Sequence, residues 1–230
     1  MAQHTDRTKE PAVRGFDTLH IPELTITRLP DGMDIYALDA GDQPLNRITV
    51  SYASGLMEAS IPDALLLATR LLREGTDSYT GSEISEKLDY HGAWLKSDAL
   101  SHDTAISLWS LNKSTTTLLP LFKELLICPR FPEKEFITLR DKHKARYLLS
   151  QKNVGYVASQ MDKTRVFGQS HPMSRVLDAD EIDALTTDDI RNAYNKVFTS
   201  APRVFVTGEI KEILPAITDF FSRFKFESTS

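Results

Sequence analysis

Apolar and polar residues alternate in several short segments of the chain, and turn-forming residues such as Pro30 and Gly32 separate the first of them. A period of two places the apolar side chains on one face of a strand, so each segment is predicted to be a β-strand. Six strands are predicted, at residues 24–29, 33–37, 48–52, 93–97, 104–111 and 204–207.

Other segments carry apolar residues three and four positions apart, which is typical of helices packed on a core. In the segment 61–73, Leu65, Ala68 and Leu72 share one helical face. Further helices are predicted at residues 80–90, 114–127, 132–152, 154–167, 186–197 and 213–224.

Two of these helices have a start signal, because Thr80 with Glu83 and Thr186 with Asp189 have the spacing of capping residues. Strands in one group and helices in another predict an α+β fold. We expect a mixed, mostly antiparallel sheet of about five or six strands with helices packed on one face.

The domain organisation follows from where the periodic pattern begins. Residues 1–20 are charged and polar and precede any periodic segment, so they are predicted to be a flexible leader. Residues 21–230 show no internal linker or fixed repeat, and we predict that they form a single domain.

Composition narrows the choice of partners and compartment. The 230 residues are 41% hydrophobic and carry a formal net charge of −5, which disfavours nucleic acid or a membrane as partner. The longest apolar cluster, 64–72, is too short to span a bilayer, and no secretory signal is apparent. A single cysteine, Cys128, allows no internal disulfide. We expect a reducing compartment, most simply the cytoplasm.

A family resemblance appears when the segments are taken in order. Around the helix that precedes Gly75-Thr76, the chain carries "CPRFPEKEF" at 128–136, "FGQSHPMSR" at 167–175 and "LTTDDIRNAYNKVFTSAPRVFVTGEI" at 185–210. Over residues 22–226 this order resembles the repeating half of the insulinase/pitrilysin peptidases, which include the mitochondrial processing peptidase and its non-catalytic relatives. A subunit of that family normally carries two such halves, and this chain matches one.

The resemblance implies where a zinc site would lie. In catalytic members the helix before Gly-Thr carries H-x-x-E-H, with two histidine ligands and a glutamate general base, and a glutamate on a later helix completes the site. The corresponding residues here are Leu66, Thr69 and Arg70, with Arg146 at the later position. A guanidinium has no acceptor and stays charged, so we predict that these positions hold no metal.

Two interpretations of this helix remain open. It is either a vacated catalytic helix or simply an amphipathic helix with Arg70 and Arg73 on its solvent side. In the first case, zinc is expected only in a catalytic partner.

The resemblance also implies a peptide-binding edge strand, since active relatives add the substrate as a strand beside the segment that matches 95–98. The residues here are Leu95, Lys96, Ser97 and Asp98, where the family usually has Asn-Ala at the positions of Lys96 and Ser97. Charged residues also protect ordinary edge strands from pairing, and we favour that solvated-edge interpretation.

Other candidate chemistry is less specific. No two of the six histidines share one predicted helix at a spacing of three or four residues. His102-Asp103 could suggest a catalytic pair, but a turn or strand entrance is the better interpretation. We interpret Cys128 as a small buried residue at a helix end and His171-Pro172 as a structural loop.

Three functional hypotheses follow. The first is a non-catalytic peptidase-like domain that pairs with a homologous subunit or second half bearing H-x-x-E-H and helps to enclose a peptide substrate. The second is an active zinc metallopeptidase or other hydrolase whose ligands have moved to other positions. The third is a purely structural assembly domain.

Overall fold

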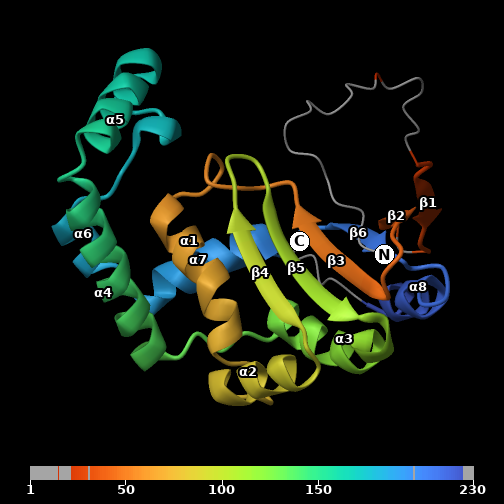
Figure 1. The fold of residues 1–230 in the computed structure, drawn as a ribbon. Coiled ribbons are helices and arrows are strands. Elements are labelled where there is room, and N and C mark those ends of the chain that lie inside the picture. Colours follow the sequence, from red (N-terminus) through yellow and green to blue (C-terminus); the bar gives the residue numbers. More distant parts are fainter. Residues whose placement is uncertain (1–14, 16–21, 31, 199, 225–230) are drawn as a thin grey trace, which may run out of the picture.

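The structure, a computed structural model, describes residues 15, 22–30, 32–198 and 200–224. Apart from Gly15, the predicted leader lies outside the described residues, and the single-domain assignment stays a prediction. One open sheet of six strands runs through the molecule (Figure 1). Its strands are β1 (Thr25–Arg28), β2 (Asp34–Asp39), β3 (Leu45–Tyr52), β4 (Trp94–Ala99), β5 (Thr104–Leu111) and β6 (Arg203–Gly208).

The strand order is β1-β2-β6-β3-β5-β4, so β1 and β4 are the two edges. Only β2 and β6 pair in parallel, and the four other neighbouring pairs are antiparallel. The prediction of a mixed, mostly antiparallel sheet is confirmed.

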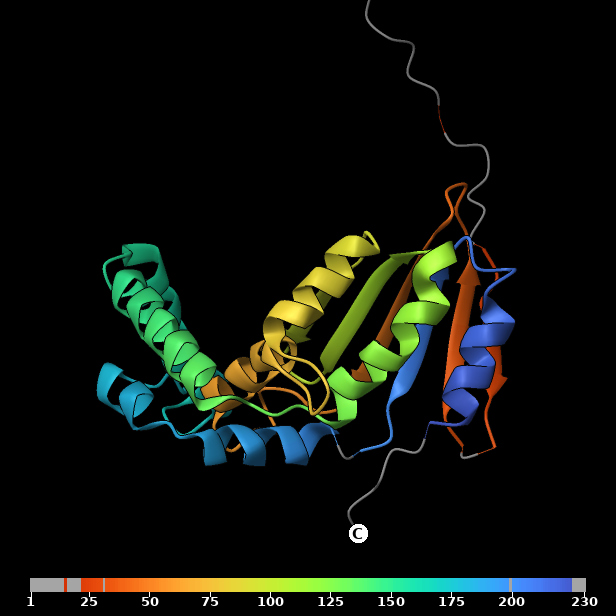
Figure 2. The same ribbon diagram turned by 90° about the horizontal axis from the view of Figure 1, so that it is seen from below.

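Helices cover one face of this sheet because its two faces differ in chemistry. The covered face is apolar: Ile48 and Val50 of β3 oppose Leu108 and Ile106 of β5, and all four are at most 1% exposed. Three helices lie along that side in both views, α2 (Gly81–Tyr90), α3 (Asn112–Ile127) and α8 (Leu214–Ser222) (Figures 1 and 2). The register places Arg47, Thr49 and Ser51 of β3 on the opposite, open face.

The remaining helices extend the molecule to one side, away from the sheet (Figure 2). They are α1 (Pro62–Leu71), η1 (Leu72–Glu74), α4 (Glu133–Ser150), α5 (Val154–Phe167), η2 (Pro172–Ser174), α6 (Ala179–Ala184) and α7 (Thr187–Phe198). Helix α1 packs between β4, α4 and α7, so it joins the sheet to the helical part. This places α1 where two layers of the fold meet.

The local signals explain most helix boundaries. Both predicted caps form, since Thr80 and Glu83 make a reciprocal capping box and Asp189 exchanges hydrogen bonds with Thr186. Helix α3 continues through Pro120 and starts two residues earlier than predicted. Helix α6 was not predicted, although Asp178 and the side chain of Glu181 form a third capping box.

Among the described residues, no helix combines the length and the apolarity needed to cross a membrane.

Candidate functional site

The three positions that the resemblance assigns to H-x-x-E-H lie on α1. Leu66 and Arg70 are one turn apart and half-buried, whereas Thr69 is only 2% exposed. The Thr69 hydroxyl donates a hydrogen bond to the carbonyl of Leu66 at 3.0 Å, so it is engaged within its own helix. None of the three presents a metal ligand or a general base.

The later position, Arg146, is exposed on α4, and α4 packs beside α1. The two helices are joined by Asp63 and His143, whose Oδ1 and Nε2 atoms are 2.6 Å apart. Their side chains are only 14% and 13% exposed. His143 lies one turn before Arg146, so this contact holds that part of α4 beside α1.

Arg70 and Arg146 come close enough for their charges to interact. Burial lowers the pKa of the Arg70 guanidinium, the positive charge of Arg146 lowers it further, and Asp63 partly offsets both effects. The two arginines thus lie on helices that pack on each other although the sequence separates these helices by more than 60 residues. The result is a positively charged site between α1 and α4.

Zinc does not fit the residues present. A zinc ion needs neutral imidazole, thiolate or carboxylate donors, and here it would meet two guanidinium groups. Asp63 and His143 are the nearest donors, but they bond each other across the helix interface. Across the described ranges, no group of three or more His, Cys, Asp or Glu side chains has the arrangement to hold a metal ion.

The predicted peptide strand is the edge strand β4, which pairs only with β5. Leu95 and Ser97 face the helix-covered side, opposite Leu108 and Ile106. Lys96 and Asp98 project from the open face and form an ion pair of 2.8 Å. Helix α1 lies beyond the free edge of β4 (Figure 1), so the charged site and this edge are neighbours.

The open face next to this edge is aromatic. Trp94 of β4 stacks on Trp109 of β5 with ring centroids 5.5 Å apart, and Arg47 of β3 lies 5.0 Å from the Trp109 ring. Trp94 is 54% exposed. Such a surface can contact an extended chain through its side chains while the edge pairs with the backbone.

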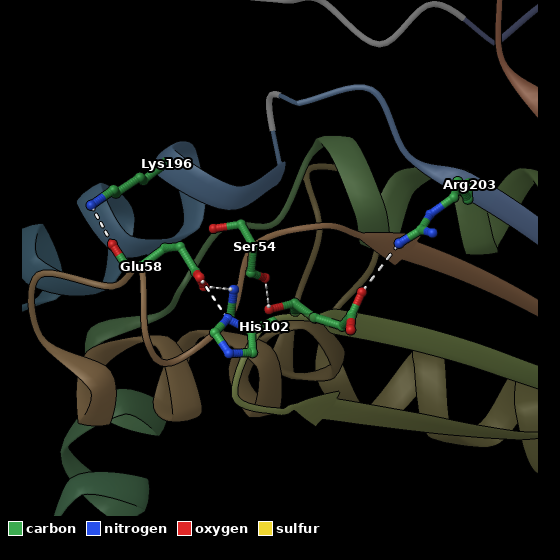
Figure 3. Close-up of polar contacts among 8 residues, drawn as sticks. Ser54, Glu58, His102, Lys196 and Arg203 are labelled. Atoms are coloured by element: carbon green, nitrogen blue, oxygen red, sulfur yellow. Dashed lines mark hydrogen bonds and ion pairs between the residues drawn. The ribbon is translucent and has the colours of Figure 1, made fainter. Parts of the chain in front are cut away.

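A polar network secures the segment between β3 and α1 at the end of β4 (Figure 3). Glu58 bonds the Nδ1 of His102 at 2.9 Å and accepts the Gly55 amide at 2.8 Å. Lys196 donates to the carbonyl of Glu58. The His102 hydrogen bond, followed by the Gly55 amide, lowers the pKa of the Glu58 carboxyl below its usual value.

His102 and Asp103 thus do not act as a pair. Asp103 instead accepts a hydrogen bond from Arg203 at 3.3 Å. His102 and Asp103 both lie in the turn between β4 and β5. The predicted turn is confirmed. His171 accepts a hydrogen bond from the Met173 amide at the start of η2, which is a structural role as predicted. The interpretation of Cys128 as a buried residue is wrong, because Cys128 is partly exposed.

Sequence reasoning missed the two side-chain pairs that hold this region, Asp63 with His143 and Glu58 with His102. Their partners are 80 and 44 residues apart, so no local spacing could reveal them. It also missed a cavity of about 820 Å³ between the starts of α2 and α7. Leu66, Thr69, Arg70 and Arg146 do not line that cavity, and its Arg191 donates a hydrogen bond to the carbonyl of Arg130.

Comparison with known proteins identifies the fold. No protein-family model and no curated protein matches the chain. A peptidase M16 inactive domain from Pseudomonas fluorescens is similar with a TM-score of 0.78 and 20% identity, over 86% of this chain and 50% of that one. The periplasmic protease PqqL from Escherichia coli is similar with a TM-score of 0.74 and 15% identity, over 94% and 24%.

A third similar structure is the ferredoxin protease FusC in complex with Arabidopsis ferredoxin, with a TM-score of 0.67 and 16% identity. The match covers 94% of this chain and 27% of the FusC chain. The chain therefore has the fold found in M16 peptidases. It spans about half the length of the Pseudomonas domain, and about a quarter of the two proteases.

Proposed function

We propose that this chain is a non-catalytic peptidase-like domain that pairs with a homologous chain or half bearing H-x-x-E-H and helps to enclose its peptide substrate. The observation that carries the proposal is the position of Arg70 and Arg146. They lie on the packed helices α1 and α4, at two positions where the resemblance expects zinc ligands, and the charge of Arg146 lowers the pKa of Arg70. The fold shared with an M16 inactive domain supports the same conclusion.

The charge of this site supports an inactive rather than a weakened centre. Replacing one ligand by a neutral residue would leave a site of lower affinity, but two cations repel a divalent ion. The position of the general base is also lost, because Thr69 is buried and bonded within α1. Zinc chemistry would thus be supplied by the partner alone.

The contribution to substrate binding would come from β4 and the face beside it. Its free edge offers backbone groups to an extended peptide, and Trp94 and Arg47 offer side-chain contacts next to that edge. The ion pair of Lys96 with Asp98 protects the edge until a partner or substrate covers it.

Metal analysis together with a cleavage assay tests the loss of catalysis. The purified chain, incubated with zinc and desalted, should hold far less than one zinc per chain and should not cleave unfolded peptide substrates. A fourfold variant, Leu66→His, Thr69→Glu, Arg70→His and Arg146→Glu, serves as the matched positive control because its backbone positions would restore the ligand set. Stoichiometric zinc with turnover in the wild-type chain would establish relocated ligands instead.

Affinity purification from native cells tests the pairing. The tagged chain should recover a homologous protein that carries H-x-x-E-H, identified by mass spectrometry. Recovery of partners that lack this motif would favour a purely structural assembly role. Fractionation of the same cells would test the expected cytoplasmic location, for which the periplasmic neighbour PqqL offers the alternative.

A further inference from the structure

A helical arm projects from the molecule on the side away from the sheet (Figure 2). We define the arm as residues 140–167, which comprise the second half of α4, the following turn and α5. None of the 14 residues of α5 is buried. A helix of this length is marginal in water unless its side chains pack on something.

A short returning segment packs on the end of α5. Phe167 stacks on His171 with ring centroids 5.0 Å apart, and the Ser174 hydroxyl donates to the carbonyl of Lys163 at 3.0 Å. These contacts hold the end of the helix, and in its first half Tyr156 is half-buried and lies near Tyr147 of α4 and Asp63 of α1. Most residues of α5 are nevertheless exposed, which leaves a surface of the arm open to a partner.

The arm exposes aliphatic side chains in a helical stripe. Val154, Val157 and Met161 follow one another at positions i, i+3 and i+7 of α5. Val154 is 84% exposed and Met161 is 68% exposed. Val157 and Met161 also line a shallow groove of about 560 Å³. Exposed apolar stripes of this kind commonly dock in a groove of another protein.

The charge of the arm specifies the occupant further. Residues 140–167 contain seven Lys and Arg residues against two Asp, a formal charge of +5, whereas the whole chain carries −5. Opposite charges steer and align protein partners. An acidic rim would therefore fit around the stripe, and a second arm of the same kind would be repelled.

We propose that the arm docks on the homologous H-x-x-E-H-bearing half, which presents an apolar groove rimmed by carboxylates to Val154, Val157 and Met161. This inference rests on the proposed pairing and assigns a surface to it. The matched structures are longer than the part they share with this chain. In the Pseudomonas domain, the shared part is 50% of the chain, so the remainder is about as long as the shared part. The aliphatic stripe also favours a protein groove over nucleic acid, which would call for aromatic stacking platforms.

Two exposed positions allow a matched test in the full-length chain. Met161→Glu places a carboxylate in the stripe, and Tyr90→Glu makes the same change on α2, where Tyr90 is 84% exposed. Each tagged variant is purified from native cells, and the H-x-x-E-H protein is quantified by mass spectrometry. We expect Met161→Glu to reduce its recovery at least ~10-fold, in line with the loss of one buried anchor, and Tyr90→Glu to leave it unchanged.

The outcomes separate this inference from the proposed function. Equal recovery with both variants would overturn the docking surface while leaving the pairing intact. Failure of the wild-type chain to recover any H-x-x-E-H protein would overturn the pairing itself. Two further measurements test for other occupants. If light scattering shows a dimer of the chain that Met161→Glu dissociates, the occupant is a second copy of the chain. If the chain binds phosphatidylserine vesicles and Met161→Glu abolishes this binding, the occupant is a membrane surface.

Discussion

Substitution of Gly55 tests how closely the loop before α1 packs on the turn between β4 and β5, next to the candidate site. It lies in the segment between β3 and α1, where Leu56 and Met57 donate backbone hydrogen bonds to the carbonyls of Leu100 and Ser101 at 2.8 and 2.9 Å. A Cβ atom at position 55 would lie 2.3 Å from the oxygen of Leu100 and 2.7 Å from the amide nitrogen of Asp103.

The magnitude of the effect of Gly55→Ala follows from these distances. Both of these close contacts are backbone atoms, so no side chain can rotate away, and the loop must move away from the turn between β4 and β5 by roughly 1 Å. Overpacking of this kind costs about 1–3 kcal/mol, and weakening two backbone hydrogen bonds adds about 0.5–1.5 kcal/mol each. Together these terms lead us to expect Gly55→Ala to lower the free energy of unfolding by about 2–6 kcal/mol.

Urea denaturation followed by circular dichroism measures this change. Gly15→Ala is the matched control, because nothing lies within 4 Å of a Cβ built at Gly15. It should change the free energy of unfolding by less than ~0.5 kcal/mol. If Gly55→Ala were as stable as this control, the close approach of the loop to the end of β4 would be wrong, and with it the placement of α1 beside the edge strand.

Three further predictions address the same region. A double-mutant cycle with Asp63→Ala and His143→Ala should give a coupling energy of about 1–3 kcal/mol in urea denaturation, and a value near zero would remove the link between α1 and α4. Because the pKa of Glu58 is lowered, its contribution to stability is present above the usual carboxyl range and lost as pH falls through the folded-state pKa. Glu58→Gln should therefore be destabilising at pH 7, and the destabilisation should shrink as the pH is lowered through that pKa; a pH-independent effect would contradict this. Burial, with Asp77 and Glu124 nearby, raises the pKa of the Cys128 thiol, so it should react with iodoacetamide more slowly at pH 8 than a free cysteine does, and an equal rate would contradict this.

The sequence was informative wherever a short-range pattern decides the structure. Alternation located all six strands, and the helix 154–167 matches α5 at both ends. The edge position of β4 could be expected only from the family resemblance, because strand order depends on contacts between distant segments. Alternation also placed β4 at 93–97, while the strand runs on to Ala99, where the hairpin turn ends it.

The assignment of Arg70 and Arg146 to the candidate site rests on the resemblance and stays a prediction. The structure adds that their helices, α1 and α4, pack on each other. Nothing in the sequence indicated that Asp63 and His143 would join α1 to α4, since the two residues are 80 positions apart and meet only because their helices pack together. Helix α6 was missed for a different reason: its six residues are too few to show a helical period, although Asp178 and Glu181 provide the cap.

The side chains at the positions that the resemblance assigns to metal ligands bear on the proposed function. A helix under no constraint but packing would need only apolar residues on its inner face, and Leu65, Leu67 and Ala68 supply them. Arg70 is instead half-buried beside a second arginine, which costs desolvation and like-charge repulsion. A fold tolerates such a pair most easily when an anionic group lies beside it, and Asp63 of α1 offsets part of the cost at Arg70. If the proposed pairing is correct, an anionic group of the partner or of the peptide would offset the rest.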